Sequence, residues 1–200
     1  MRLHRILFIT LFCGIITLFA KAQEFGGGLI FGVSTSQVAG DMLGGFNKIG
    51  VMAGAFTNRR VKEKLQVQLE IVYIEKGSRN PNIHKNNIAE ISLTYIEVPV
   101  RINLKQKENI GIEFGILPAF NISSAMNDNF SDIIIDPPFE KYDFGVFAGI
   151  NYHLTEKIIL NTRINSSIIP IRPHSSGATW GFNKGQYNTI LSFALHYQII

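Results

Sequence analysis

The stretch LQVQLEIVY at residues 65–73 alternates apolar and polar side chains at every second position. Five apolar side chains share one of its faces: Leu65, Val67, Leu69, Ile71 and Tyr73. Three polar side chains share the other: Gln66, Gln68 and Glu70. A period of two is that of a β-strand, because successive side chains point to opposite faces of a sheet. The stretch therefore predicts a strand with one apolar and one polar face.

The same alternation recurs in seven other segments, with turn-forming residues between them. The eight predicted strands cover residues 24–34, 48–57, 65–76, 90–103, 110–120, 142–154, 157–168 and 188–199. They are 10 to 14 residues long, whereas strands of soluble domains average about five or six residues. This length suits a tilted transmembrane strand, which needs about 9–11 residues.

The glycines indicate which face of these strands lies inside. Most strand glycines fall on the polar faces: Gly26, Gly28, Gly32, Gly50, Gly54, Gly111, Gly115, Gly145 and Gly149. A solvent-facing surface has no need of them, because each glycine weakens a strand. The interior of an eight-stranded barrel, in contrast, is only just wide enough for side chains. Small and charged residues inside, with large apolar residues outside, are typical of a membrane barrel.

The connections between the predicted strands alternate in length. Four are long and polar: residues 35–47, 77–89, 121–141 and 169–187. Three are short: residues 58–64, 104–109 and 154–157. Outer-membrane barrels alternate long extracellular loops with short periplasmic turns. The fold class predicted for residues 23–200 is therefore all-β, a single-domain, eight-stranded antiparallel up-and-down transmembrane β-barrel with both termini in the periplasm.

The first 22 residues have the three parts of a signal peptide. Arg2 and Arg5 precede an apolar run over residues 6–19, and Ala20-Lys21-Ala22 supplies small residues for cleavage. The alternative, an uncleaved N-terminal anchor, needs a longer run than this to span a bilayer. We expect residues 1–22 to be removed on export and the protein to reside in the bacterial outer membrane.

The composition excludes several classes of protein. With 46% hydrophobic residues the chain is not disordered, and its single cysteine, Cys13, rules out a disulfide framework and a cysteine-based zinc site. The predicted signal peptide holds three basic residues and no acidic one, so its removal lowers the net charge from +4 to +1. No basic stripe for nucleic acid remains. We expect no cofactor and no nucleic-acid partner.

The run Tyr95-Ile96-Glu97-Val98-Pro99-Val100-Arg101-Ile102 resembles a strand common in the PorT-like outer-membrane β-barrel family of Bacteroidota. The Gly-Val-x-Ala-Gly strands at residues 50–54 and 145–149, and the strand at 65–76, are similar to the same family. The resemblance covers essentially the whole mature chain. It implies an outer-membrane barrel, and it implies a link to protein secretion, since the namesake of the family takes part in a gliding-associated secretion system.

Six charged residues are expected to point into the lumen: Glu70, Glu97, Arg101, Glu113, Asp143 and Arg163. Buried charges are tolerated when they are paired, so we expect an ionic network that plugs the lumen. An ion or proton path is the alternative, for which eight strands leave little space. His153 and His196 also point inward, and we expect hydrogen-bonded lumen residues rather than metal ligands.

The sequence shows no convincing catalytic set. Ser192 and His196 share a face, but it is the inward one, and no nucleophile motif surrounds Ser192. We therefore expect a non-enzymatic protein that contacts outer-membrane lipid and has a structural or loop-mediated interaction role. Two alternatives stay open: a soluble lipocalin-like periplasmic barrel that binds a ligand, and a lipid-modifying outer-membrane enzyme.

The connection at residues 169–187 is the best candidate for protein contacts, because barrels carry function in their loops. Five of its side chains suit a contact surface: Arg172, His174, Trp180, Phe182 and Lys184. The alternative is a surface loop whose single tryptophan packs on the barrel rim.

Overall fold

The computed structural model describes residues 25–41, 43–81, 90–128, 131–174 and 184–200, which form nine strands. The strands are β1 (Phe25–Ala39), β2 (Lys48–Lys62), β3 (Leu65–Arg79), β4 (Glu90–Glu97), β5 (Val100–Lys105), β6 (Ile110–Asn127), β7 (Tyr142–His153), β8 (Ile158–Ser167) and β9 (Tyr187–Gln198). Within these ranges no helix is long and apolar enough to cross a membrane. The predicted signal peptide lies outside the described residues.

β4 and β5 are two halves of one strand of the barrel. Both pair with β3 on one side and with β6 on the other. They are separated at Val98 and Pro99, where proline has no N–H to donate to a ladder. The chain bridges the gap, since the Val98 N–H donates to the Pro118 carbonyl oxygen and the Pro99 carbonyl oxygen accepts from Glu70. The nine strands therefore make a ring of eight.

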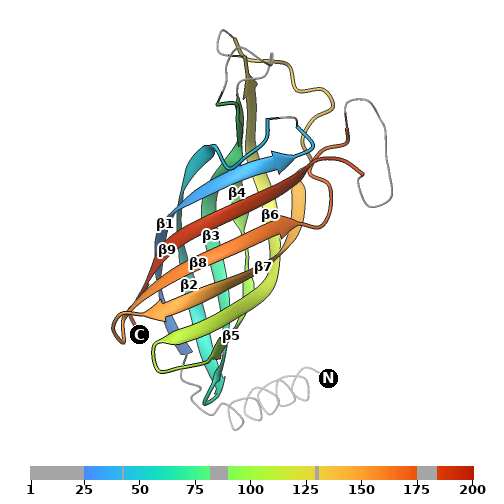
Figure 1. Cartoon of the computed structure of the whole chain (residues 1–200). Helices are drawn as coiled ribbons and strands as arrows, with labels where there is room; N and C mark the ends of the chain where they lie inside the picture. Colours follow the sequence, from blue (N-terminus) through green and yellow to red (C-terminus); the bar gives the residue numbers. More distant parts are fainter. Residues whose placement is uncertain (1–24, 42, 82–89, 129–130, 175–183) are drawn as a thin grey trace, which may run out of the picture.

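Every strand runs antiparallel to its neighbours, and β9 closes the ring by pairing with β1 from Gly28–Gln198 to Ala39–Tyr187. Figure 1 shows the resulting tall barrel, with the short connections and the C-terminus at its lower end and the long connections at its upper end. Closure leaves no free sheet edge along the wall, as a membrane requires. The predicted all-β fold, an eight-stranded antiparallel barrel, is confirmed.

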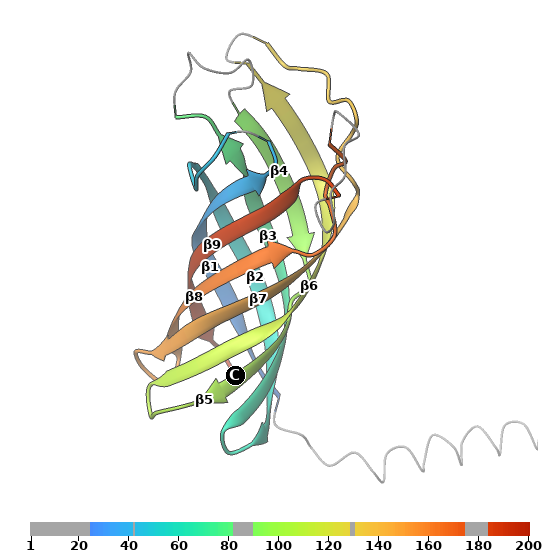
Figure 2. The ribbon, with the colours of Figure 1, turned by 45° about the vertical axis from the view of Figure 1, so that its right-hand side comes forward.

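Each predicted strand is present, and four run at least three residues further than predicted. β1 continues to Ala39, β2 to Lys62, β3 to Arg79 and β6 to Asn127. Arg79 pairs with Glu90, and Glu90 pairs with Asn127, so three strands rise together at the upper end (Figure 2). The sequence prediction ended these strands where the apolar alternation stops. A backbone ladder continues beyond that point because an apolar face is needed only where lipid surrounds the strand.

The outer surface is apolar and the interior is polar. Phe31, Ile71 and Phe114 are 54%, 56% and 43% exposed on the outside of the barrel. Gln68 and Arg101, by contrast, are buried inside. A soluble ligand-binding barrel would have the opposite arrangement, so the structure argues against the lipocalin-like alternative.

The inward glycines make room for side chains of the lumen. A Cβ atom at Gly28 would lie 2.0 Å from the Tyr197 carbonyl oxygen and 2.7 Å from the Phe56 ring. A Cβ atom at Gly115 would lie 2.6 Å from the Phe147 ring. Because both aromatic rings fill space that a side chain would otherwise take, these glycines fit the narrow interior as expected.

Replacing Gly28 with alanine places a methyl group against the Phe56 ring. We expect Gly28→Ala to lower the free energy of unfolding by about 1–3 kcal/mol through overpacking. The matched control is Gly27→Ala, whose Cβ would meet only the Phe56 carbonyl oxygen, at 3.3 Å. We expect the control to change stability by about 0.5 kcal/mol or less. Urea unfolding in detergent micelles measures both variants, and equal destabilisation would contradict the inward placement of Gly28.

Candidate functional site

Four charged side chains from β3, β5, β6 and β8 meet inside the barrel and form a cluster that we call the charge quartet: Glu70, Arg101, Glu113 and Arg163. Arg163 donates from Nε to Glu113 at 2.7 Å and from Nη1 and Nη2 to Glu70 at 3.1 and 3.0 Å. Arg101 donates from Nη1 to Glu113 at 2.7 Å, and its Nε lies 3.7 Å from Glu70. All four side chains are at most 4% exposed. Two cations thus neutralise two anions out of water.

Neutral side chains add hydrogen bonds to the quartet, although the Arg101 Nε has no hydrogen-bond partner among the described residues. Gln68 accepts from Arg101 and donates to Glu70 at 2.9 Å. Asn151 donates to Glu113 at 2.9 Å and accepts from Asn161 at 2.9 Å. A carboxylate has more acceptor sites than one guanidinium fills, so these amides remove part of the cost of burying it.

A second buried cluster lies on the side of the long connections. Lys76 donates to Glu97 at 2.8 Å, lies 3.6 Å from Asp143 and stands 4.0 Å from the centre of the Tyr95 ring. Asp143 also accepts from Ser167 at 2.8 Å. Lys76 is 1% exposed, so its ammonium depends on these two carboxylates and on the aromatic face.

The six charges expected in the lumen are all buried, but they fall into two groups. Four of them form the quartet, while Glu97 and Asp143 pair with Lys76. The sequence prediction left Lys76 out, although two signals pointed to it. It has the inward parity of Glu70 on the same strand. Moreover, four expected carboxylates faced only two guanidiniums, and this excess of negative charge called for another cation.

The residues considered for catalysis or metal binding do not assemble into a site. Ser192 donates to the Arg163 carbonyl oxygen at 3.4 Å, while the His196 ring lies 5.5 Å from the Phe56 ring. His196 was expected to be hydrogen-bonded, but its Nδ1 has no hydrogen-bond partner in the part of the chain that the structure describes. His153 is half-buried near the short connections. Among the described residues, no group of three histidine, cysteine or acidic side chains is placed to hold a metal ion.

Arg172 differs from its expected place on a contact surface. It is 6% exposed, because its guanidinium lies 5.1 Å from the Phe139 ring centre and donates to the Asp136 carbonyl oxygen at 2.8 Å. Its Nη1 also lies 3.2 Å from the Met126 sulfur. Arg172 therefore fastens the connection after β8 to the connection after β6. It does not face solvent as the sequence prediction supposed.

The other residues of that proposed surface have mixed positions. His174 is partly exposed and Lys184 is exposed. Trp180 and Phe182 lie outside the described residues.

In the connection after β1, Asp41 accepts from the Leu43 N–H at 2.8 Å, and burial raises the pKa of the Asp41 carboxyl. The upper end of the barrel thus contains packed loop residues as well as exposed ones.

Comparison with known proteins agrees with this architecture. The family model described as "Outer membrane protein beta-barrel domain" matches residues 21–172. Neisserial surface protein A has a similar structure, with a TM-score of 0.51 and 15% identity over 86% of this chain and 96% of that one. Ail, the attachment invasion locus protein of Yersinia pestis, was solved with the heparin analogue sucrose octasulfate. Its structure matches with a TM-score of 0.51 and 10% identity over 88% of this chain and 99% of that one. No curated protein matches. These identities establish the fold alone.

The Arg163 guanidinium lies 4.1 Å from the centre of the Phe147 ring. Arg163→Met tests the quartet, because methionine keeps a long side chain beside this ring but removes the guanidinium. Glu70 and Glu113 then share Arg101 as their one cation in the quartet. We expect the free energy of unfolding to fall by about 3–5 kcal/mol, with a lower temperature for conversion of the folded, fast-migrating gel band. The exposed Lys107→Met should change it by about 0.5 kcal/mol or less. Equal melting of the two variants would mean that the quartet does not stabilise the barrel.

Proposed function

The chain belongs to the outer membrane protein beta-barrel domain family, and from this premise we propose a non-enzymatic outer-membrane protein with a closed lumen. Its role is structural or is carried by contacts of its extracellular loops. The observation that supports this most is the charge quartet, whose four side chains reach across the lumen from different strands. We expect no ion passage through the layer of the lumen that holds the quartet, because its polar side chains bind one another and leave no room for water.

The upper part of the lumen supports the same proposal. Beside the buried Lys76 it contains apolar side chains that are at most 1% exposed: Ile74, Ile91, Leu93, Ile171 and Ile190. Leu43 and Phe139, from the connections after β1 and β6, pack into the same hydrophobic cluster. The apolar side chains oppose an ion path because they exclude water, and the quartet below them opposes it because its two cations neutralise its two anions.

The loop-mediated role rests on where the accessible groups lie. Ile134, in the connection after β6, is 89% exposed, while Ile133 and Ile135 beside it pack against the hydrophobic cluster. Arg172 ties this connection to the one after β8. A loop anchored in this way presents side chains at defined positions, which favours specific contacts.

The link to a secretion system rests on the resemblance of the strand at residues 95–102, and the cleaved signal peptide rests on residues 1–22.

Conductance measurements test the closed lumen. We expect the purified protein, inserted into a planar lipid bilayer, to give no stable conductance steps at 100 mV in 1 M KCl. A general porin inserted in the same way serves as the positive control. Reproducible steps from the wild-type protein would contradict a closed lumen, whatever the role of its loops.

Cysteine labelling tests the orientation of the barrel. Ser123 is exposed on the part of β6 that extends beyond β7, and Lys107 is exposed in the short turn after β5. With the long connections outside the cell, an impermeant thiol reagent should label Ser123→Cys on intact cells. It should label Lys107→Cys only after the outer membrane is opened. The reverse pattern would invert the proposed orientation.

A further inference from the structure

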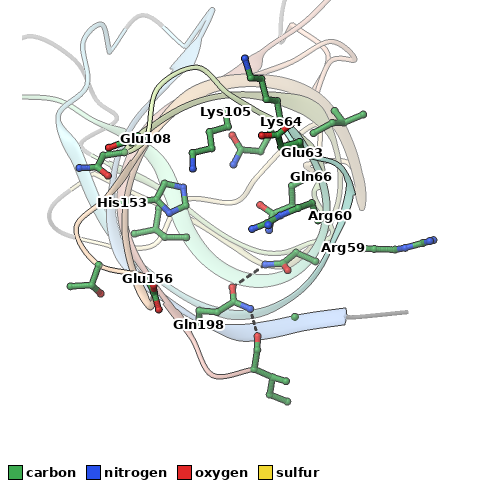
Figure 3. Close-up of a pocket in the computed structure, with 18 of the residues that line it drawn as sticks. Arg59, Arg60, Glu63, Lys64, Gln66, Lys105, Glu108, His153, Glu156 and Gln198 are labelled. Atoms are coloured by element: carbon green, nitrogen blue, oxygen red, sulfur yellow. Dashed lines mark hydrogen bonds between the residues drawn. The ribbon is translucent and has the colours of Figure 1, made fainter. Parts of the chain in front are cut away.

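The lumen opens into a cavity at the end of the barrel that carries the short connections. The cavity has a volume of about 1550 Å³ and is lined by the lower ends of the strands and by their turns (Figure 3). Its inner wall includes Asn58, Asn103 and Ile159, each less than a tenth exposed. The next inward residue above Asn103 is Arg101 of the charge quartet, and the next ones above Asn58 and Ile159 are the buried Phe56 and Asn161. The cavity is therefore a cup with one mouth.

Five basic residues border this cavity: Arg59, Arg60, Lys64, Lys105 and His153. Arg60, Lys105 and His153 differ from the other two in their place on the strands. Each follows a buried inward-facing asparagine by two positions, namely Asn58, Asn103 and Asn151. A strand returns to the same face every second residue, so all three basic side chains are on the inward face. Figure 3 shows them around the opening, whereas Arg59 points away from it.

These basic groups are not neutralised as the deeper charges are. Arg101 and Arg163 each contact two carboxylates. The side chains of Arg60 and Lys105, in contrast, form no hydrogen bond or ion pair with any residue that the structure describes. The acidic residues nearby, Glu63, Glu108 and Glu156, are exposed in the turns at the margin of the cavity. Arg60 and Lys105 are exposed as well, but they lie on the inward faces of their strands, and a concave wall concentrates the potential of the charges on it.

We propose that this cup is a binding site for an anionic ligand whose carboxylate or phosphate groups are held by Arg60 and Lys105. A guanidinium donates two parallel hydrogen bonds to an oxyanion, and an ammonium adds a mobile point charge. The side-chain amides of Gln66, Asn103 and Gln198 line the same cavity and offer further donors. In the proposed orientation the ligand enters from the periplasm and leaves by the same mouth.

The size of the cup favours a ligand larger than a single ion. Pockets for small organic ligands commonly measure about 300–1,000 Å³, and this cavity exceeds that range. A molecule with more than one anionic group could contact Arg60 on β2 and Lys105 on β5 together. The proposal is independent of whether the lumen conducts, because the site lies below the quartet.

Calorimetric titration of the purified protein in zwitterionic detergent tests the site, with inorganic pyrophosphate and citrate as separate probes. We expect saturable binding of at least one probe in 20 mM salt and markedly weaker binding in 300 mM salt. The tighter probe tells whether phosphate or carboxylate groups suit the cup. Substituting Arg60→Gln and Lys105→Gln together should weaken binding at least about tenfold, because two charged hydrogen-bond donors are lost.

The matched control is Arg59→Gln. Arg59 adjoins Arg60 in sequence, but its guanidinium lies outside the cup, 6.0 Å from the centre of the Phe25 ring. Loss of the Arg59 charge should change the affinity for the probe by less than about twofold, because water and salt screen a charge that lies outside the binding site. Folding of every variant is checked by its heat-modifiable gel band. No saturable binding of either probe would overturn the proposal. Equal effects of Arg59→Gln and of the double substitution Arg60→Gln with Lys105→Gln would overturn it as well.

Discussion

A charge taken out of water inside a barrel must find its counter-charge across the lumen. The quartet meets this requirement with strands that are distant in sequence, since Arg163 and Glu70 are separated by 93 residues. Each guanidinium contacts both carboxylates. Loss of one member therefore leaves the others buried without full compensation, which costs far more than an exposed pair contributes. The four strands that carry the quartet are held in one register by this requirement.

The positions of small residues follow from the same requirement. A Cβ atom at Gly149 would lie 2.8 Å from a Glu113 carboxylate oxygen, so this glycine leaves room for the carboxylate. Gly115 leaves room for the Phe147 ring, and the Arg163 guanidinium lies 4.1 Å from the centre of that ring. Glycine, aromatic ring and guanidinium thus form one stack across the lumen. The glycines that weaken the strands locally are what allow the charges to meet.

Much of this arrangement follows from the sequence, because two-residue periodicity decides which side chains share the lumen. The alternation of LQVQLEIVY placed Gln68 and Glu70 inward, and both are there. Other features depend on tertiary contacts that periodicity does not contain. The end of β6 lies beyond the apolar pattern, and Arg172 is buried only because a distant loop supplies Phe139. A sequence pattern predicts that a charged loop residue is exposed, because the pattern does not show which other loop covers it.

The lumen changes in character along its length, and solvation explains the order of its layers. Near the mouth, water solvates basic side chains, so Arg60 and Lys105 need no carboxylate partner. One inward residue deeper, Asn58 and Asn103 are buried, and an unpaired charge there would carry a large desolvation cost. Deeper still, charges reappear, but only with their counter-charges. The buried amides of Asn58 and Asn103 therefore lie between the basic side chains at the mouth, which have no ion-pair partner among the described residues, and the deeper charges, which are paired within the barrel.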